Sequence, residues 1–228
     1  MDKKEYAIIV AGGKGSRMNS DLPKQFLALH GKPILMHTLE AFHNYSSAIE
    51  IILVLPLKDI DTWKSLCKKH NFSTPYHLTI GGNSRFQSVK NGLNSIQDSS
   101  GLVAIHDGVR PLISTHIIDA SFRIAAAHKS AVAAVRLKES IRVTTQDTTQ
   151  AVDRALYRLI QTPQTFDLEL IRQAYEIDEV PSLTDDASVA EKAGHKISLF
   201  EGSYDNIKVT TPEDLIIAEA LMNRKNNG

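Results

Sequence analysis

The sequence predicts an α/β fold in which a mainly parallel, Rossmann-like sheet is covered by helices on both faces. Short apolar segments rich in β-branched residues alternate along the chain with segments whose apolar residues recur at helical spacing. The strand-like segments are apolar almost throughout, which is typical of strands buried on both faces. The chain has 228 residues and shows no internal repeat, low-complexity tract or linker. We therefore expect one domain over residues 1–228.

The first half of the chain shows this alternation most clearly. Its predicted strands are apolar runs followed by glycine, proline or aspartate: Tyr6–Ala11, Ile49–Leu55, Tyr76–Ile80 and Leu102–His106. Each precedes a predicted helix with apolar residues on one face: Pro33–Phe42, Lys58–His70, the segment marked by Phe86, Val89, Leu93 and Ile96, and Ile117–His128. The carboxyl ends of such parallel strands are where ligands bind.

The second half adds two predicted strands, Ala131–Val135 and Lys196–Phe200. Predicted helices cover Asp167–Ile177, a segment from Thr184 to about Gly194, and a last segment that begins at Thr211. Thr184 and Thr211 are interpreted as N-cap residues because two acidic residues follow each of them within the first turn. By itself, Thr162–Phe166 is interpreted as a turn.

The alternation is interrupted between about residues 136 and 158. Ser140–Thr144 alternates polar and apolar residues, and Gln146–Thr149 has turn-forming residues, so this part predicts a β-hairpin that leaves the sheet. An isolated hairpin is marginally stable in water, and its apolar residues are too few to form a core. We expect this arm to pack against a second subunit of a homodimer, in preference to a mobile surface arm.

The composition excludes several classes of function. The 26 basic residues balance the 26 acidic ones, so no net charge attracts nucleic acid or an anionic membrane. No apolar run approaches the ~20 residues that span a bilayer, and the first strand begins too early for a preceding signal peptide. The single cysteine, Cys67, excludes an internal disulfide and suits a reducing compartment. We expect a cytoplasmic protein without nucleic-acid or membrane partners.

A glycine-rich loop, Gly12–Met18, follows the first predicted strand, and Pro23–Phe26 follows the loop. Glycines allow backbone N–H groups to approach an anion closely. Lys14, Arg17 and Lys24 add positive charge that suits phosphate groups. The stretch therefore predicts a binding site for a nucleoside triphosphate.

Two better-known phosphate loops do not match this stretch. A Walker loop has Lys-Ser/Thr after its last glycine, whereas Gly15 is followed by Ser16 and Arg17. A dinucleotide-binding loop has a third glycine at the position where this chain has Met18. The simple alternative, a glycine turn between a strand and a helix, does not account for the cations that follow so closely.

Two more loops follow predicted strands and are expected at the same edge of the sheet. Gly81 and Gly82 follow the third strand, and Asp107–Pro111 follows the fourth. Asp107 is suited to bind a ribose hydroxyl or to help hold Mg²⁺. Arg110 is suited to pair with a phosphate or to fix Asp107, and a purely structural Asp–Arg pair is the alternative.

The run Ala11–Met18 followed by Pro23–Phe26 resembles the signature of sugar- and polyol-phosphate nucleotidyltransferases, which have the nucleotide-diphospho-sugar transferase fold. Within them it is most similar to the 2-C-methyl-D-erythritol 4-phosphate cytidylyltransferase family. The similarity continues through five later segments, so that it extends from Ala11 to Leu215: Asp107–Pro111, Val152–Arg154, Thr162–Phe166, Thr184–Ser188 and Asp205–Leu215. The resemblance implies transfer of CMP from CTP to 2-C-methyl-D-erythritol 4-phosphate, with release of pyrophosphate, in non-mevalonate isoprenoid synthesis.

The resemblance also implies the site residues. The implied catalytic residues are cations that stabilise charge on the α-phosphate and the pyrophosphate: Arg17, Lys24 and Lys208. The implied nucleotide-binding residues are Ala11, Gly12, Gly13, Gly15, Ser16, Gly82, Ser88 and Asp107, with Gly82 and Ser88 reading the cytosine ring. The implied residues for the polyol phosphate are Asp107, Arg110, Ser140, Arg154, Thr184 and Asp205, with Arg154 reaching the neighbouring subunit's substrate. Asp107 is the expected ligand of Mg²⁺ or another divalent cation.

The sequence leaves open the roles of a few residues and the choice among related functions. Ser140 stands where the family often has threonine, and Asn83–Arg85 is a variable stretch, so no role is assigned to Arg85. Ribitol-5-phosphate cytidylyltransferases differ only in the acceptor, although Asp205 favours methylerythritol phosphate. A sugar-1-phosphate nucleotidyltransferase would use the same loop with a different base. A non-catalytic nucleotide-binding module should have lost some of its site residues, but Arg17, Lys24, Asp107 and Lys208 are all present.

Overall fold

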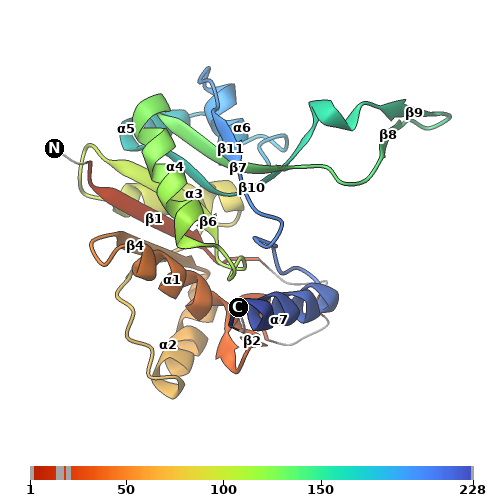
Figure 1. The fold of residues 1–228 in the computed structure, drawn as a ribbon. Coiled ribbons are helices and arrows are strands. Elements are labelled where there is room, and N and C mark those ends of the chain that lie inside the picture. Colours follow the sequence, from red (N-terminus) through yellow and green to blue (C-terminus); the bar gives the residue numbers. More distant parts are fainter. Residues whose placement is uncertain (1–2, 14–17, 19–21, 227–228) are drawn as a thin grey trace.

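A central sheet organises the fold, as a computed structural model that describes residues 3–13, 18 and 22–226 shows. Its strand order is β11-β7-β10-β6-β1-β4-β5 (Figure 1). The strands are β1 (Glu5–Val10), β4 (Glu50–Leu55), β5 (His77–Ile80), β6 (Leu102–Asp107), β7 (Ser130–Arg136), β10 (Arg158–Asp167) and β11 (Leu199–Glu201). Neighbouring strands are parallel, except that β10 runs antiparallel to β6 and β7. The predicted mainly parallel sheet is confirmed.

Helices cover both faces of this sheet, as predicted (Figure 1). They are α1 (Ile34–Tyr45), α2 (Ile60–Lys69), α3 (Arg85–Ser95), α4 (Thr115–His128), α5 (Leu168–Ala174), α6 (Asp186–Lys192) and α7 (Pro212–Asn226). Strand β1 shows how the layers form, because alternate residues of a strand point to opposite faces. Ala7 and Ile9 pack in the core cluster that includes α1 and α4. Tyr6 and Ile8 pack in the cluster that includes α3, α5 and α6.

A third, smaller cluster fastens α7 to the rest of the fold. It joins α7 to a short hairpin, β2 (Ala28–Leu29) with β3 (Lys32–Pro33), and to the loop after β6. Val209, just before α7, is fully buried in it, and its N–H donates to the Val109 carbonyl at 2.9 Å. This bond holds the segment that carries Lys208 beside the loop that carries Asp107.

The predicted hairpin is confirmed. It consists of β8 (Ile141–Thr144) and β9 (Thr149–Val152), followed by a 3₁₀ turn, η4 (Arg154–Leu156). Figure 1 shows this arm projecting away from the central sheet, and most of its residues are exposed. Two further 3₁₀ turns, η2 (Lys24–Phe26) and η3 (Leu57–Asp59), lie in the loops after β1 and β4.

The interpretation of Thr162–Phe166 as a turn is wrong, because these residues form the middle of β10. Proline and polar residues suggested a turn locally, but the strand lies between two others and its polar side chains find buried partners. The Thr165 hydroxyl donates to Ser121 Oγ at 2.9 Å. Pro163 lies where the pairing of β10 with β7 shifts register, so the N–H that proline lacks is not needed there.

Other predicted boundaries also shift. The N-cap of α6 is Asp185 rather than Thr184, because the Asp185 carboxylate accepts the Ser188 N–H at 2.9 Å. The Ser188 hydroxyl in turn accepts the Asp185 N–H at 3.2 Å, which completes a capping box. The predicted N-cap Thr211 is in place before α7, where its hydroxyl accepts the Asp214 N–H at 3.4 Å.

Substituting Gly92 in α3 is expected to destabilise the protein. A Cβ at this position would lie 2.9 Å from Ile8 Cγ2 and 3.2 Å from Val54 Cγ2, because the helix approaches β1 and β4 closely there. Alanine gains up to about 1 kcal/mol in helix propensity, but the overpacking costs about 1–3 kcal/mol. We expect Gly92→Ala to lower the free energy of unfolding in urea titrations. Asn94→Ala, on the exposed side of the same helix, is the control and should not destabilise; equal stability of the two variants would contradict the prediction.

Among the described residues, no helix is both long and apolar enough to cross a membrane.

Candidate active site

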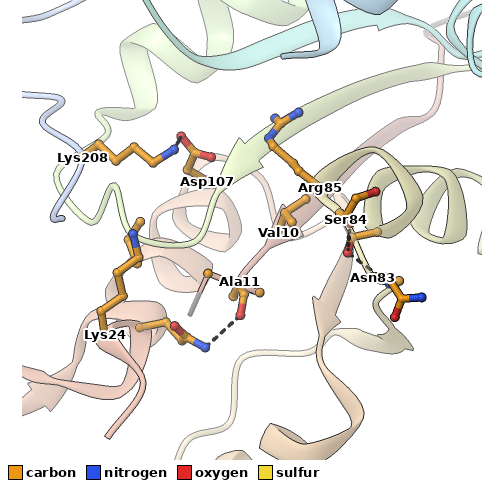
Figure 2. A pocket seen from close by; sticks show the side chains of 14 residues that line it. Val10, Ala11, Lys24, Asn83, Ser84, Arg85, Asp107 and Lys208 are labelled. Carbon is orange, nitrogen blue, oxygen red and sulfur yellow. Dashed lines mark hydrogen bonds and ion pairs between the residues drawn. The ribbon is translucent and has the colours of Figure 1, made fainter. Parts of the chain in front are cut away.

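A pocket, called the first pocket below, opens at the carboxyl edge of the sheet (Figure 2). Its walls come from the loop after β1, from η2, from the start of α3, and from the segments that carry Asp107 and Lys208. The lining residues are Val10, Ala11, Gly12, Gly13, Lys24, Gln25, Gly82, Asn83, Ser84, Arg85, Ser88, Asp107, Val109 and Lys208. The three loops that the sequence predicted at this edge therefore do meet there.

Backbone hydrogen bonds hold these loops against the sheet. The Ala11 N–H donates to the Val54 carbonyl at 3.0 Å, and the Gly81 N–H donates to the Leu55 carbonyl at 2.8 Å. Each loop thus continues the pairing of the sheet for one residue beyond its strand before it turns over the pocket. Paired backbone groups of this kind give the pocket a fixed floor.

Gln25 is a site residue that sequence reasoning did not assign. Its side chain is fully buried, and its Nε2 donates to the Ala11 carbonyl at 2.9 Å. This bond fastens η2 to the end of β1 and so places the neighbouring Lys24 in the first pocket. A Cβ on Gly13 would lie 3.2 Å from Lys24 Cε, so the lysine stem passes directly over the loop.

Asp107 lies between two cations at the end of β6. Its Oδ2 is 3.1 Å from Arg110 Nε and 3.1 Å from Lys208 Nζ. Arg110 is held in turn by the Asn206 carbonyl, which accepts a hydrogen bond from Nη1 at 2.8 Å. Burial by itself raises the pKa of a carboxyl group, but the charges of Lys208 and Arg110 outweigh it and hold the pKa of Asp107 well below its usual range. Asp107 is therefore ionised at neutral pH.

His106 precedes Asp107 but supports the loop rather than serving as a base. Its ring is fully buried and packs edge-on against Phe42, with 5.0 Å between ring centroids. Its Nε2 lies 3.4 Å from the Arg110 carbonyl. Burial lowers the pKa of His106 to about 3, so the imidazole is neutral at physiological pH.

A second pocket adjoins the first on the side of α6. Its lining residues are Arg85, Asp107, Arg110, Ile160, Gln161, Thr162, Gln164, Thr184, Asp185 and Lys208. Arg85, Asp107 and Lys208 line both pockets and form the shared wall. The Asp107 N–H donates to Thr162 Oγ1 at 3.1 Å, so β10 fixes this wall from the side of the second pocket.

Comparison with known proteins identifies the family. The family model for 2-C-methyl-D-erythritol 4-phosphate cytidylyltransferase matches residues 6–224. The chain belongs to this family. It is 50% identical to the protein of that name from Bacteroides thetaiotaomicron over 219 residues, which cover 96% of this chain and 100% of the relative. It is 48% identical to the one from Bacteroides fragilis, over 95% of this chain and 98% of the relative.

Solved structures of the cytidylyltransferase family share the fold. A crystal structure of 4-diphosphocytidyl-2C-methyl-D-erythritol synthase from Anaerococcus prevotii matches with a TM-score of 0.82 and 31% identity, over 97% of this chain and 96% of that one. The 2-C-methyl-D-erythritol 4-phosphate cytidylyltransferase of Francisella tularensis matches with a TM-score of 0.79 and 30% identity, over 96% of this chain and 99% of that one. The chain is thus a nucleotidyltransferase in family and in fold.

The structure brings together the two residues of this cytidylyltransferase that are predicted to read the base. The Gly82 N–H donates to Ser88 Oγ at 3.1 Å, and the Ser88 hydroxyl donates to the Ser84 carbonyl at 2.8 Å. A Cβ on Gly82 would lie 2.4 Å from Gln87 Cβ, so this turn requires glycine. Gly82 and Ser88 both line the first pocket, beside Ala11, Gly12 and Gly13.

Other predicted site residues lie elsewhere. Ser140 and Arg154 are on the arm and line neither pocket, and Arg154 Nη1 donates to the Lys138 carbonyl. Asp205 pairs with Arg224 of α7 and also lies outside both pockets. Thr184 and Arg110 line the second pocket. Gly15, Ser16 and Arg17 fall outside the residues that the structure describes, so their predicted roles stay predictions.

Proposed function

We propose that the chain transfers the cytidylyl group of CTP to the phosphate of 2-C-methyl-D-erythritol 4-phosphate, giving CDP-methylerythritol and pyrophosphate. The observation that carries this proposal is the wall shared by the two pockets, formed by Arg85, Asp107 and Lys208. Gly12 and Gly13 border the first pocket and Thr184 borders the second. A nucleotide in the first pocket and an acceptor in the second would both place their phosphates beside these three shared residues. The two phosphates would then be within reach of each other.

The reaction requires charge stabilisation rather than a base. A phosphate monoester is largely ionised at pH 7, so its oxygen attacks the α-phosphorus of CTP directly while the bond to the β-phosphate breaks and pyrophosphate leaves with the electron pair. Lys24 and Lys208, together with Arg17, stabilise the negative charge that develops on the α-phosphate and the leaving group. The neutral, buried His106 agrees with a site that needs no imidazole base.

Mg²⁺, or another divalent cation, enters with the triphosphate in this proposal. The described residues contain no group of three or more His, Cys, Asp or Glu side chains that would hold a metal ion alone. Mg²⁺ is commonly held by one carboxylate together with substrate phosphates, and Asp107 supplies that carboxylate in the first pocket. Its Oδ2 faces Arg110 and Lys208, so Oδ1 is the oxygen suited to the cation. When bound, the cation neutralises triphosphate charge.

The arm joins two subunits in this proposal. Large apolar side chains on the arm and at the adjoining start of β10 are exposed, including Leu156 at 81% and Leu159 at 53%. Because Arg154 and Ser140 line neither pocket of their own chain, their predicted contacts with the polyol phosphate require a second copy. Leu156→Ser with Leu159→Ser should shift the protein to monomers in sedimentation analysis, whereas Leu57→Ser, an exposed leucine outside the arm, should not. A wild-type protein that sediments as a monomer would contradict the dimer.

We also propose that the protein works in the cytoplasm, where a free thiol persists. Cys67 is half-buried in α2 and shows no disulfide. Burial raises the pKa of its thiol, with the Tyr76 hydroxyl opposing this shift, which favours the protonated thiol over the reactive thiolate.

Pyrophosphate release from CTP and Mg²⁺ tests the proposed function. The assay compares 2-C-methyl-D-erythritol 4-phosphate with ribitol 5-phosphate, and it is repeated with the other nucleoside triphosphates. We expect turnover with CTP and methylerythritol phosphate alone. Turnover only with ribitol phosphate would overturn the acceptor, turnover with another nucleotide would overturn the base, and CTP binding without turnover would leave a non-catalytic nucleotide-binding protein.

A further inference from the structure

Arg85 completes the wall between the two pockets, yet the sequence assigned it no role. It is the first residue of α3 and lines both pockets, as only Asp107 and Lys208 also do among the described residues. Figure 2 shows the Arg85 side chain at the start of α3, across from the side chains of Asp107 and Lys208. The guanidinium thus lies at the border where the two proposed substrates would meet.

A buried carboxylate and a tyrosine hold Arg85 in this position. Its Nη1 and Nη2 donate to the two oxygens of Asp186 at 2.9 and 2.6 Å. The Tyr175 hydroxyl donates to Asp186 Oδ1 at 2.6 Å. Asp186 is fully buried and Tyr175 nearly so, and they belong to α6 and to the end of α5. Three helices are therefore joined at one bidentate ion pair.

This pair leaves part of the guanidinium available. Arginine has five N–H donors in a planar fork, and Asp186 accepts two of them. No hydrogen bond from the Nε–H or from the second hydrogen of either Nη is found among the residues that the structure describes. The Arg85 side chain is 30% exposed, whereas the Asp186 side chain is fully buried. The unused N–H donors therefore belong to Arg85, the member of the ion pair that borders the two pockets.

Helix packing alone does not require this arrangement. Taking an ion pair out of water carries a desolvation cost that often cancels its attraction, and an apolar pair of similar volume is often as stable. Arginine is also the residue whose planar fork of donors suits the recognition of phosphoryl oxygens. The buried side of the pair orients Arg85, and the exposed side faces two pockets that already contain Lys24 and Lys208.

We propose that Arg85 binds a phosphoryl oxygen where the two pockets meet, and that Asp186 and Tyr175 are positioning residues that hold its guanidinium for this contact. The proposal rests on the proposed function. The oxygen belongs either to the α-phosphate of the nucleotide or to the phosphate of the acceptor, and the kinetic constants for the two substrates separate these sources.

The test uses a double variant that removes the Arg85 charge together with that of Asp186, so that no buried carboxylate is left unpaired. Arg85→Met with Asp186→Leu replaces the ion pair by apolar side chains, and is expected to keep its melting temperature within a few degrees. We expect kcat/KM to fall by about 100-fold or more, the loss typical of one oriented donor to a phosphoryl or oxyanion oxygen. Lys90→Met is the matched control, because Lys90 is a cation on the same helix that pairs with Glu176 and lines neither pocket.

The kinetic constants of the double variant either assign the phosphoryl oxygen bound by Arg85 or overturn the proposal. A rise confined to the KM of the acceptor places the oxygen on the acceptor, and a rise confined to the KM of CTP places it on the nucleotide; a fall in kcat with both KM values unchanged supports a contact made in the transition state. A folded double variant with kcat and both KM values within about 2-fold of the active wild type would overturn the proposal. Inactive wild-type protein would instead overturn the proposed function. If the double variant does not fold, Arg85→Lys replaces it, since lysine keeps a cation against Asp186 but loses the bidentate fork.

A separate variant tests whether Tyr175 positions Arg85 through Asp186. Tyr175→Phe removes the hydroxyl that orients Asp186 while the ion pair remains. We expect it to lower kcat/KM several-fold in the wild type and to have no further effect in the double variant, because its influence passes through Arg85. An equal loss in both backgrounds would show that Tyr175 acts independently of Arg85.

Discussion

Lys24→Ala is expected to lower kcat by more than ~100-fold while the fold remains intact, because single cationic or oxyanion contacts supply a few kcal/mol of transition-state stabilisation. Lys24 lies in η2, which Gln25 fastens to the end of β1, and its stem passes over Gly13 into the first pocket. In the proposed function, its ammonium group stabilises the charge that develops as pyrophosphate leaves.

Steady-state rates at saturating CTP and acceptor measure this effect, and circular dichroism checks the fold. Lys58→Ala is the control, because Lys58 lies in the loop after β4 and its exposed side chain does not line the first pocket. The control should keep the wild-type rate. A Lys24→Ala enzyme with near-normal turnover would remove Lys24 from the catalytic residues and leave the charge to Arg17 and Lys208.

Asp107→Asn is expected to reduce both activity and stability. The substitution removes the negative charge that Arg110 and Lys208 share, and it removes the carboxylate proposed for Mg²⁺. Losing one partner of a buried ion pair costs about 3–5 kcal/mol. We expect about 3 kcal/mol here, since Lys208 is 41% exposed and the Asn206 carbonyl still holds Arg110. The rate should fall by about 100-fold or more.

The stability difference has a predicted pH dependence. The pKa of Asp107 is lower in the folded protein than in the unfolded chain, where it is about 3.9. The ionised carboxylate therefore stabilises the fold fully above about pH 4, and this contribution is lost as the pH falls through the lower, folded-state pKa. Denaturant unfolding of wild type and Asp107→Asn should show a constant difference between about pH 5 and 8 that narrows in acid.

A matched carboxylate on the surface serves as the control for this stability effect. Asp119 pairs with Arg123 on α4 at 3.9 Å, and both side chains are more than half exposed. Asp119→Asn should change the free energy of unfolding by less than about 1 kcal/mol. If Asp107→Asn is no more destabilising than this surface variant, the Asp107 cluster does not contribute to stability as its geometry indicates.

The sequence by itself determined the architecture and the chemistry of the loops. The apolar run of β1, in which Ile8 and Ile9 pack on opposite faces, specifies a strand buried on both sides. Glycines and lysines next to strand ends specify an anion site wherever those ends meet. Such features are local: they depend on backbone conformation, on the alternation of side chains along a strand, and on the residue types in one short segment.

Only the tertiary structure decided which polar and charged side chains pair with one another. Asp107 meets Lys208, and Arg85 meets Asp186, although each pair is about a hundred residues apart along the chain. The polar segment Thr162–Phe166 has the local composition of a turn. It forms a strand because it pairs with β6 on one side and with β7 on the other. The physical reason is that a buried polar or charged group is stable only with its partner, and neither residue of such a pair carries a local signal that names the other.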